Sequence, residues 1–257
     1  MISLPVTQPF PWDQLLSYLS TRCIPSFEYI DNQCFNRLHN GKNVIVSFNR
    51  DAKQLEININ PNTKNSKEIY RRVEQLFYPA LSTDIIYKHL SIALPESKMM
   101  KGFRPIGCWD PFELCIRTII GQQVSVAAAQ TIMHRLIDRC EILTPQSILD
   151  ANLEKMGMPE RRVQTLRNLG QAVIDIKIDF TWPWSRLDNA LSEISGIGPW
   201  TRGYLAIRLG RDPDAFPETD VGLIRAAGAD DAKNLLDIAK RWQPYRAYAA
   251  TCLWSLD

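Results

Sequence analysis

The residues with the clearest chemical potential lie in the last quarter of the chain. The run Gly196 to Pro199 (GIGP) follows an expected helix and opens another, because a proline ring fixes φ at a value suited to a first helical turn. Glycines one residue apart permit positive φ and let backbone N–H groups and a helix N-terminus approach a phosphate. Asp220 lies 22 residues after Gly198, at another expected helix start. This pattern predicts a helix-hairpin-helix that holds a nucleic-acid backbone, with a carboxylate nearby.

Each of these features also has a plainer interpretation. A Gly-X-Gly turn can be a tight corner between helices, and an aspartate at a helix start can simply cap that helix. Trp200 and Tyr204 lie four residues apart on one helical face, where aromatic side chains commonly fill a core. The spacing of the whole set favours a functional site over these separate interpretations.

The elements that must position these residues fall into two parts. Residues 1–95 carry the extended-structure signals VIVSF (44–48) and LEINI (55–59), separated by the turn-forming NRDAKQ. Helical patterns cover 12–20 and 67–77, so this part is expected to be a small α+β domain. The stretch 93–111, which is rich in proline and glycine, is the expected linker.

The second part, residues 96–257, is expected to be all-helical, because its apolar residues recur at helical spacing. Ser, Asp and Pro residues mark the expected helix starts. These starts lie near Asp110, Ser125, Pro159, Ser185, Pro199, Asp220 and Pro244.

Composition limits the classes of function. The 257 residues are 45% hydrophobic and 23% charged, which is typical of a folded globular protein, and the formal net charge is only +2. No signal peptide and no apolar run of membrane-spanning length is present, so we expect a soluble, cytoplasmic protein. The six cysteines and three histidines lack ligand spacing, which argues against disulfides and a side-chain metal site.

The run SGIGPWTRGYLAIR (195–208) followed by PDAFPETD (213–220) resembles the helix-hairpin-helix (HhH-GPD) DNA glycosylase superfamily, most closely its 3-methyladenine DNA glycosylase II (AlkA-type) branch. Three further segments resemble that branch: 9–22, 110–132 and 242–254. The resemblance covers nearly the whole chain. It implies an N-terminal antiparallel-sheet domain over 1–95 and a helical glycosylase body over 96–257.

The resemblance places the catalytic carboxylate on Asp220. Breaking an N-glycosidic bond builds oxocarbenium character on the sugar, which a carboxylate can stabilise while it orients an attacking water. A purine alkylated at N3 or N7 is already cationic and leaves as a neutral base. Relatives that also cut the strand carry a lysine where this chain has Trp200, so we expect a monofunctional enzyme without lyase activity.

The same resemblance implies a pocket for a flipped base and a surface for DNA. The pocket aromatics are Trp200, Tyr204, Trp254 and, from the other domain, Tyr18; the alternative for each is a core filler. Gln123 takes the position of the side chain that fills the gap left in the duplex by the flipped base. The alternative is that Gln122 and Gln123 are solvent-exposed loop amides. The implied DNA contacts are Gln122, Gln123, Ser125, Gly196, Ile197, Gly198 and Thr201. Four arginines either touch phosphates or are solvated: Arg161, Arg162, Arg202 and Arg208.

The expected partner is double-stranded DNA with damaged bases, bound by a monomer. Only Cys252 lies where some relatives hold an iron–sulfur cluster, so no such cofactor is expected. The resemblance allows a sodium or potassium ion at the hairpin carbonyls of Ser195 and Ile197.

Three functions remain open. The leading one is the excision of alkylated bases such as 3-methyladenine and 7-methylguanine in base excision repair. The others are a non-catalytic helix-hairpin-helix protein that binds DNA or senses lesions, and a glycosylase for deaminated or oxidised bases. Asp220 and the aromatic set favour a glycosylase, because a pure binder needs neither.

Overall fold

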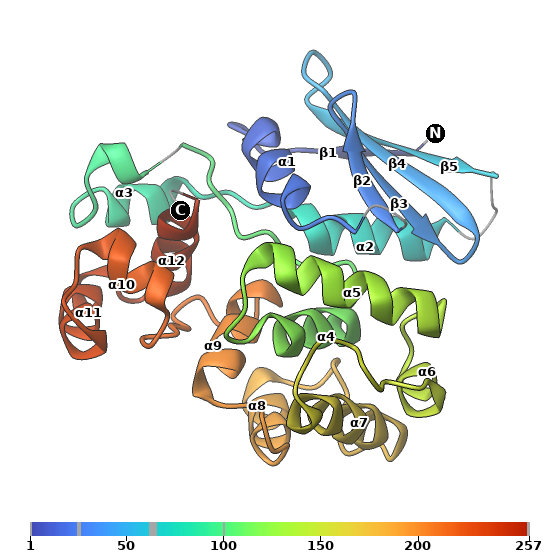
Figure 1. The fold of residues 1–257 in the computed structure, drawn as a ribbon. Coiled ribbons are helices and arrows are strands. Elements are labelled where there is room, and N and C mark those ends of the chain that lie inside the picture. The colour runs from blue at the N-terminus through green and yellow to red at the C-terminus, as the bar shows by residue number, and fades with distance from the viewer. Residues whose placement is uncertain (1, 25–26, 62–65, 100, 256–257) are drawn as a thin grey trace.

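The computed structural model describes residues 2–24, 27–61, 66–99 and 101–255, and it has an N-terminal sheet domain beside a helical body (Figure 1). The fold class expected from the sequence is therefore confirmed. The N-terminal elements are β1 (Ile2–Pro5), α1 (Trp12–Ser20), β2 (Glu28–Asp31), β3 (Cys34–His39), β4 (Lys42–Asn49), β5 (Gln54–Asn60) and α2 (Lys67–Phe77).

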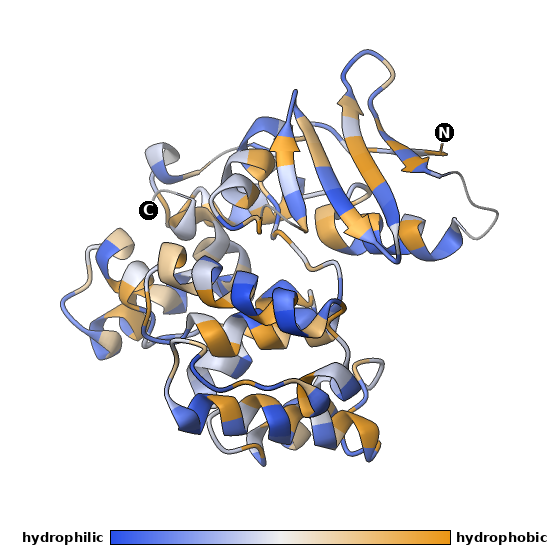
Figure 2. Ribbon diagram, turned by 45° about the vertical axis from the view of Figure 1, so that its right-hand side comes forward, coloured by the Kyte–Doolittle hydropathy of each residue, from blue (hydrophilic) through white to orange (hydrophobic). Residues whose placement is uncertain are grey.

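The strands form one antiparallel sheet in the order β1-β5-β4-β3-β2. Hydrophobic and hydrophilic residues alternate along the strands, as Figure 2 shows, because successive side chains point to opposite faces. Val46 lies opposite both Phe35 and Ile57 in the register, and all three are buried. Their face packs against apolar residues of α1 and α2 to form the core of this domain.

The helical body follows, and side-chain caps fix several of its helix starts. Asp110, Ser125, Asp220 and Asp231 each accept a hydrogen bond from a backbone N–H of the first helical turn. The helices are α3 (Asp84–Leu90), α4 (Pro111–Gly121), α5 (Val126–Cys140), α6 (Pro145–Asp150), α7 (Glu160–Ile174), α8 (Trp184–Ser192), α9 (Pro199–Arg208), α10 (Val221–Ala227), α11 (Ala232–Ala239) and α12 (Arg246–Trp254), with short 3₁₀ turns at Glu96–Lys98 and Lys240–Trp242.

The body has two apolar cores. One lies among α4 to α9, and the other lies among the last helices, α10 to α12. Ile86 and Leu90 of α3 belong to the second core, so this early helix packs beside α10 and α12, far along the chain (Figure 1). All six cysteines are free thiols, and all but Cys34 are buried.

The predicted helices at 12–20 and 67–77 and the hairpin of β4 and β5 are confirmed. The prediction missed β1, β2 and β3, and also α3, α6 and α11. These elements are short, and most of them mix polar with apolar residues, so their periodicity is weak. Two of them have local caps that the apolar pattern does not reveal, Thr144 at α6 and Asp231 at α11.

The stretch expected as a linker packs inside the protein. The Arg104 side chain is buried and donates hydrogen bonds to backbone carbonyls of Thr7, Pro9 and Tyr78. Gly102 has φ +77°, and a Cβ there would lie 2.0 Å from the Pro9 carbonyl oxygen. Arg208 of α9 donates to the Ile106 and Gly107 carbonyls, so this stretch contacts both domains.

Four charged residues join the sheet to α4. Glu28 and Arg37 lie opposite each other on β2 and β3, and both are buried. Arg37 also pairs with Glu113 of α4, and Arg117 donates to Glu28 (2.6 Å) and to Glu113 (2.7 Å). Burial raises the pKa of Glu113, but Arg37 and Arg117 outweigh it and lower the pKa to about 2.

This cluster predicts a specific loss of stability in acid. Because the folded pKa of Glu113 lies below the unfolded value of about 4.3, its contribution is complete above that value and is lost as the pH falls towards 2. We expect Glu113→Gln to lower the free energy of unfolding at pH 7 by about 3 kcal/mol and to flatten its fall in acid. Denaturant unfolding at several pH values measures both effects. Asp13→Asn, which breaks an exposed pair with Arg50, is the control and should change little.

Candidate active site

The hairpin between α8 and α9 uses its two glycines differently. Gly196 has φ +95°, and an added Cβ would lie 2.2 Å from the Thr165 hydroxyl, so only glycine fits. Gly198 has φ −83°, and a Cβ there would meet nothing within 4 Å. Of the two glycines that permit positive φ, only Gly196 adopts it. Gly198 instead leaves open space at the N-terminus of α9.

Several expected DNA contacts have internal partners. The Gln122 amide donates to the Gly196 carbonyl and to the Thr201 hydroxyl, both at 2.9 Å. Ile197 and Thr201 are only 3% and 2% exposed, so their side chains support the hairpin rather than lie on the surface. Gln123 is exposed and has φ +56°, next to α5. Figure 1 shows that α5 faces the sheet domain.

Ser125 caps α5, because its hydroxyl accepts a hydrogen bond from the Ala128 N–H at 3.2 Å. The carbonyls named for a monovalent cation have protein donors. Thr165 donates to the Ser195 carbonyl at 2.9 Å, and Arg202 donates to the Ile197 carbonyl at 3.4 Å. Each carbonyl oxygen has two lone pairs, so these donors leave one on each, and the cation at this pair stays a prediction.

Asp220 is both a helix cap and the centre of a hydrogen-bonded cluster. Its Oδ1 accepts from the Leu223 backbone N–H at 2.9 Å and from the Trp254 indole N–H at 3.2 Å. Its Oδ2 accepts from the Trp200 indole N–H at 2.8 Å. Two carboxylate oxygens offer about four lone-pair positions, so one position on Oδ2 stays free. The capping interpretation holds for this residue, and the same carboxylate also accepts from two indole N–H groups.

The aromatic residues expected around a base lie together. The Trp200 and Tyr204 rings stack with centroids 5.6 Å apart, and the Trp254 ring lies 5.4 Å from Tyr204. The hydroxyl of Tyr18, from α1 of the sheet domain, lies 3.4 Å from the Tyr204 hydroxyl. Trp200 and Trp254 therefore combine a flat apolar face with an N–H directed at Asp220.

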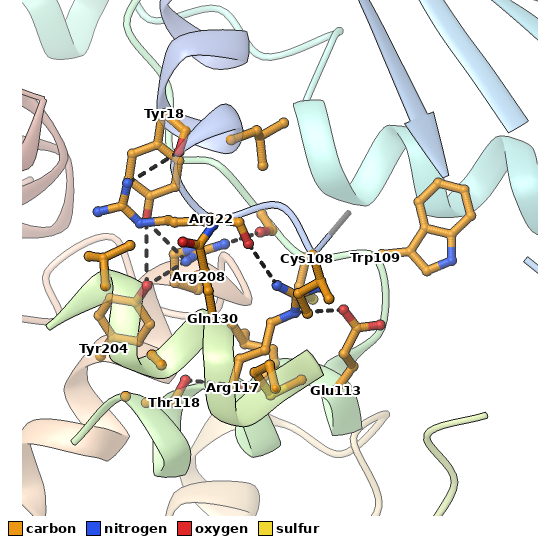
Figure 3. A pocket seen from close by; sticks show the side chains of 18 of the residues that line it. Tyr18, Arg22, Cys108, Trp109, Glu113, Arg117, Thr118, Gln130, Tyr204 and Arg208 are labelled. Carbon is orange, nitrogen blue, oxygen red and sulfur yellow. Dashed lines mark hydrogen bonds and ion pairs between the residues drawn. The ribbon is translucent and has the colours of Figure 1, made fainter. Parts of the chain in front are cut away.

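A cavity of about 460 Å³ runs between the two domains and is lined by all five of these residues. Figure 3 shows Tyr18 and Tyr204 at one part of it and the ion pair of Glu113 and Arg117 at another. A volume of this size is typical of a site for a small organic ligand. The structure thus brings the predicted acid and the four predicted aromatics to one cavity, with walls from both domains.

Arg208, which was expected at a phosphate or in solvent, lies on the wall of this cavity. Its guanidinium donates to the Ile106 and Gly107 carbonyls and to the Tyr18 and Tyr204 hydroxyls. Arg208 lies four residues after Tyr204 on α9, which is the signal that could have placed it on the same face.

Two of the other three arginines considered for phosphate contact have partners within the protein. Arg202 pairs with Asp188 at 2.9 Å, and Arg162 donates to the Gln122 carbonyl.

Among the described residues, no group of three or more His, Cys, Asp or Glu side chains could hold a metal ion. No helix in the same part of the chain is long and apolar enough to cross a membrane.

The phenols beside Arg208 differ in acidity. Burial raises the pKa of Tyr204 to about 12 and outweighs the nearby guanidinium. Burial acts on Tyr18 in the same direction, but Arg208 and Arg22 reverse it and hold the pKa of Tyr18 below its usual value. The guanidinium carbon of Arg22 lies 3.8 Å from the centre of the Tyr18 ring. Tyr18 is therefore the more acidic hydroxyl.

Comparison with known proteins agrees with this arrangement. The family model of the AlkA N-terminal domain matches residues 1–110, and the model described as HhH-GPD superfamily base excision DNA repair protein matches residues 116–241. DNA-3-methyladenine glycosylase 2 of Escherichia coli is 28% identical over 99% of this chain and 96% of its own length. DNA-3-methyladenine glycosylase of Bacillus subtilis is 26% identical over 84% of this chain and 78% of its own length.

Among solved structures, the 3-methyladenine DNA glycosylase from Archaeoglobus fulgidus has a similar fold. Its TM-score is 0.82 at 16% identity, and the match covers 99% of this chain and 97% of that chain. The two family models together span both domains, and the cavity lies between those domains. The chain therefore belongs to the HhH-GPD superfamily of base excision DNA repair proteins, with an AlkA-type N-terminal domain.

Proposed function

We propose that the protein is a monofunctional DNA glycosylase that flips alkylated bases, of the 3-methyladenine and 7-methylguanine type, out of duplex DNA and excises them by hydrolysis. The observation that carries this proposal is the Asp220 carboxylate, held by two indole N–H groups on the wall of a cavity of about 460 Å³. The names of the E. coli and B. subtilis relatives support the same substrate class. The product is an abasic site in an intact strand.

In this proposal Asp220 acts on the sugar. As the N-glycosidic bond breaks, positive charge develops on the deoxyribose, and the carboxylate stabilises it. The free lone pair on Oδ2 can accept a proton from the attacking water. The three N–H donors fix the carboxylate in place, so that little reorganisation is needed as charge develops.

The aromatic residues act on the base. A flipped base leaves the stack at a cost of a few kcal/mol, which stacking on Trp200, Tyr204 and Trp254 offsets in part. A purine nucleotide alkylated at N3 or N7 is cationic, and a desolvated cation over such rings gains ~2 kcal/mol. The base then leaves neutral and needs no acid. The open N-terminus of α9 at Gly198 is suited to a backbone phosphate.

The alternatives fit the site less well. A non-catalytic DNA-binding protein has no use for a carboxylate fixed on the wall of a cavity. An 8-oxoguanine glycosylase/lyase from Clostridium acetobutylicum matches with a TM-score of 0.73 but 14% identity, which supports a common fold alone. We expect the enzyme to act as a monomer in the cytoplasm on double-stranded DNA.

Asp220→Asn should remove activity and leave the fold intact. Asparagine caps a helix as well as aspartate does, so α10 keeps its start. Without the negative charge, we expect the single-turnover rate of base release from methylated DNA to fall about 100-fold or more, with DNA binding retained. Asp231→Asn is the matched control, because Asp231 caps α11 in the same way but is not part of the cavity. Equal rates for Asp220→Asn and the wild type would contradict the assignment.

Trp254→Phe isolates one hydrogen bond of the carboxylate. The variant keeps a ring for the base and loses the N–H that Asp220 accepts at 3.2 Å. We expect the rate of base release to fall roughly 10-fold with little change in DNA affinity. Trp182→Phe is the control, since Trp182 packs against Arg186 outside the cavity. A rate unchanged from wild type would show that this donor does not act through Asp220.

The described lining of the cavity contains no lysine, so no amine is placed to attack the sugar. We expect no covalent protein–DNA adduct when borohydride is added during the reaction, and strand cleavage only after the abasic product is heated in base. Gel electrophoresis measures both. A trapped adduct would overturn the monofunctional assignment.

A further inference from the structure

Three polar side chains form a cluster in the cavity, apart from Asp220. Arg208 Nη1 donates to both phenol oxygens, to Tyr18 at 3.2 Å and more closely to Tyr204 (Figure 3). The two hydroxyls are 3.4 Å apart. Backbone carbonyls fix the rest of the guanidinium, because Nε donates to Ile106 and Nη2 donates to Gly107 at 2.8 Å. The cluster is thus anchored from three elements and cannot easily rearrange.

Counting donors and acceptors leaves one hydroxyl proton unused. Each phenol oxygen already accepts from Arg208, and each phenol carries one proton. Only one of the two protons can serve the bond between Tyr18 and Tyr204. The other has no acceptor among the described residues, although both side chains line the cavity. Both side chains are part-buried, so this proton is available to an acceptor on a ligand in the cavity.

The charge around the cluster favours the same kind of ligand. No carboxylate of the described residues lies within ion-pair distance of Arg208 or of Arg22, whose guanidinium stacks on the Tyr18 ring. This end of the cavity is therefore positive. An oxygen with partial negative charge is stabilised there, whereas an amino group points its positive hydrogens at the guanidinium.

The order of contacts sets which part of a base meets the cluster. Asp220 is held by Trp200 and Trp254, both rings contact the Tyr204 ring, and the Tyr204 hydroxyl contacts Tyr18. A purine whose sugar bond lies at the carboxylate extends along these rings. The edge farthest from the sugar carries positions 1 and 6. That edge points towards the hydroxyl cluster.

We propose that the cluster of Tyr18, Tyr204 and Arg208 reads position 6 of the flipped base and selects purines with a 6-oxo group over purines with a 6-amino group. This inference rests on the proposed function and ranks its substrates: 7-methylguanine and the neutral deaminated purine hypoxanthine gain a hydrogen bond at position 6 that the 6-amino group of 3-methyladenine cannot accept. Tyr18 and Tyr204 thus determine specificity through their hydroxyls, in addition to the stacking of their rings.

The test is the double variant Tyr18→Phe/Tyr204→Phe, which keeps both rings and removes both hydroxyls. DNA treated with a methylating agent contains 7-methylguanine and 3-methyladenine in one sample, and chromatography measures the release of each. We expect the ratio of 7-methylguanine to 3-methyladenine release rates to fall about 10-fold. Release of hypoxanthine from a defined duplex should fall by a similar factor. Tyr245→Phe, whose ring packs against His89, is the control and should leave the ratio unchanged.

The outcomes separate this inference from the proposed function. If the double variant lowers all three rates by one common factor, or leaves them unchanged, the hydroxyls do not read position 6 and the inference is wrong. A wild type that releases none of the three bases contradicts the proposed function itself. Thermal unfolding of each variant confirms that the compared proteins are folded.

Discussion

The carboxylate of Asp220 depends on three helices at once. Its donors are the first turn of α10, Trp200 of α9 and Trp254 of α12. These helices all come from the last quarter of the chain, and their mutual packing in the body sets the position of the acid. A carboxylate that must stabilise charge in a half-enclosed cavity needs this fixed surrounding, because donors already in place require no reorganisation during the reaction. The rest of the site is arranged around this point.

The sheet domain supplies the opposite wall. Tyr18 and Arg22 project from its end of the cavity, and the paired charges of Glu28, Arg37, Glu113 and Arg117 hold it against α4. A buried charge cluster contributes little net stability, but separating its members leaves charges without partners. Any other docking of the two domains would therefore be strongly disfavoured. The N-terminal domain forms part of the cavity and does more than brace the body.

The cavity combines two opposite electrostatic environments. The Asp220 carboxylate, which we propose faces the sugar, lies at one end, while the guanidiniums of Arg208 and Arg22 lie at the other. A cationic base gains from the aromatic rings but is opposed by these guanidiniums, whereas a neutral oxo base is not. In the proposed scheme the aromatic rings give weak affinity for any cationic base, and the hydroxyls of Tyr18 and Tyr204 read the position-6 edge of the same base.

The sequence alone determined the two-part organisation, the hairpin of β4 and β5, the helices α1 and α2, and the cap at Asp220, because each depends on local pattern and turn chemistry. Spacing along α9 and the resemblance to known glycosylases also brought Trp200, Tyr204, Trp254 and Tyr18 into one hypothesis. Only the tertiary structure decided the role of Arg208, the internal bonds of Gln122 and Thr201, and the different needs of Gly196 and Gly198. The reason is physical: hydrogen-bond partners and free space depend on segments distant in sequence, and local periodicity carries no information about which distant groups meet.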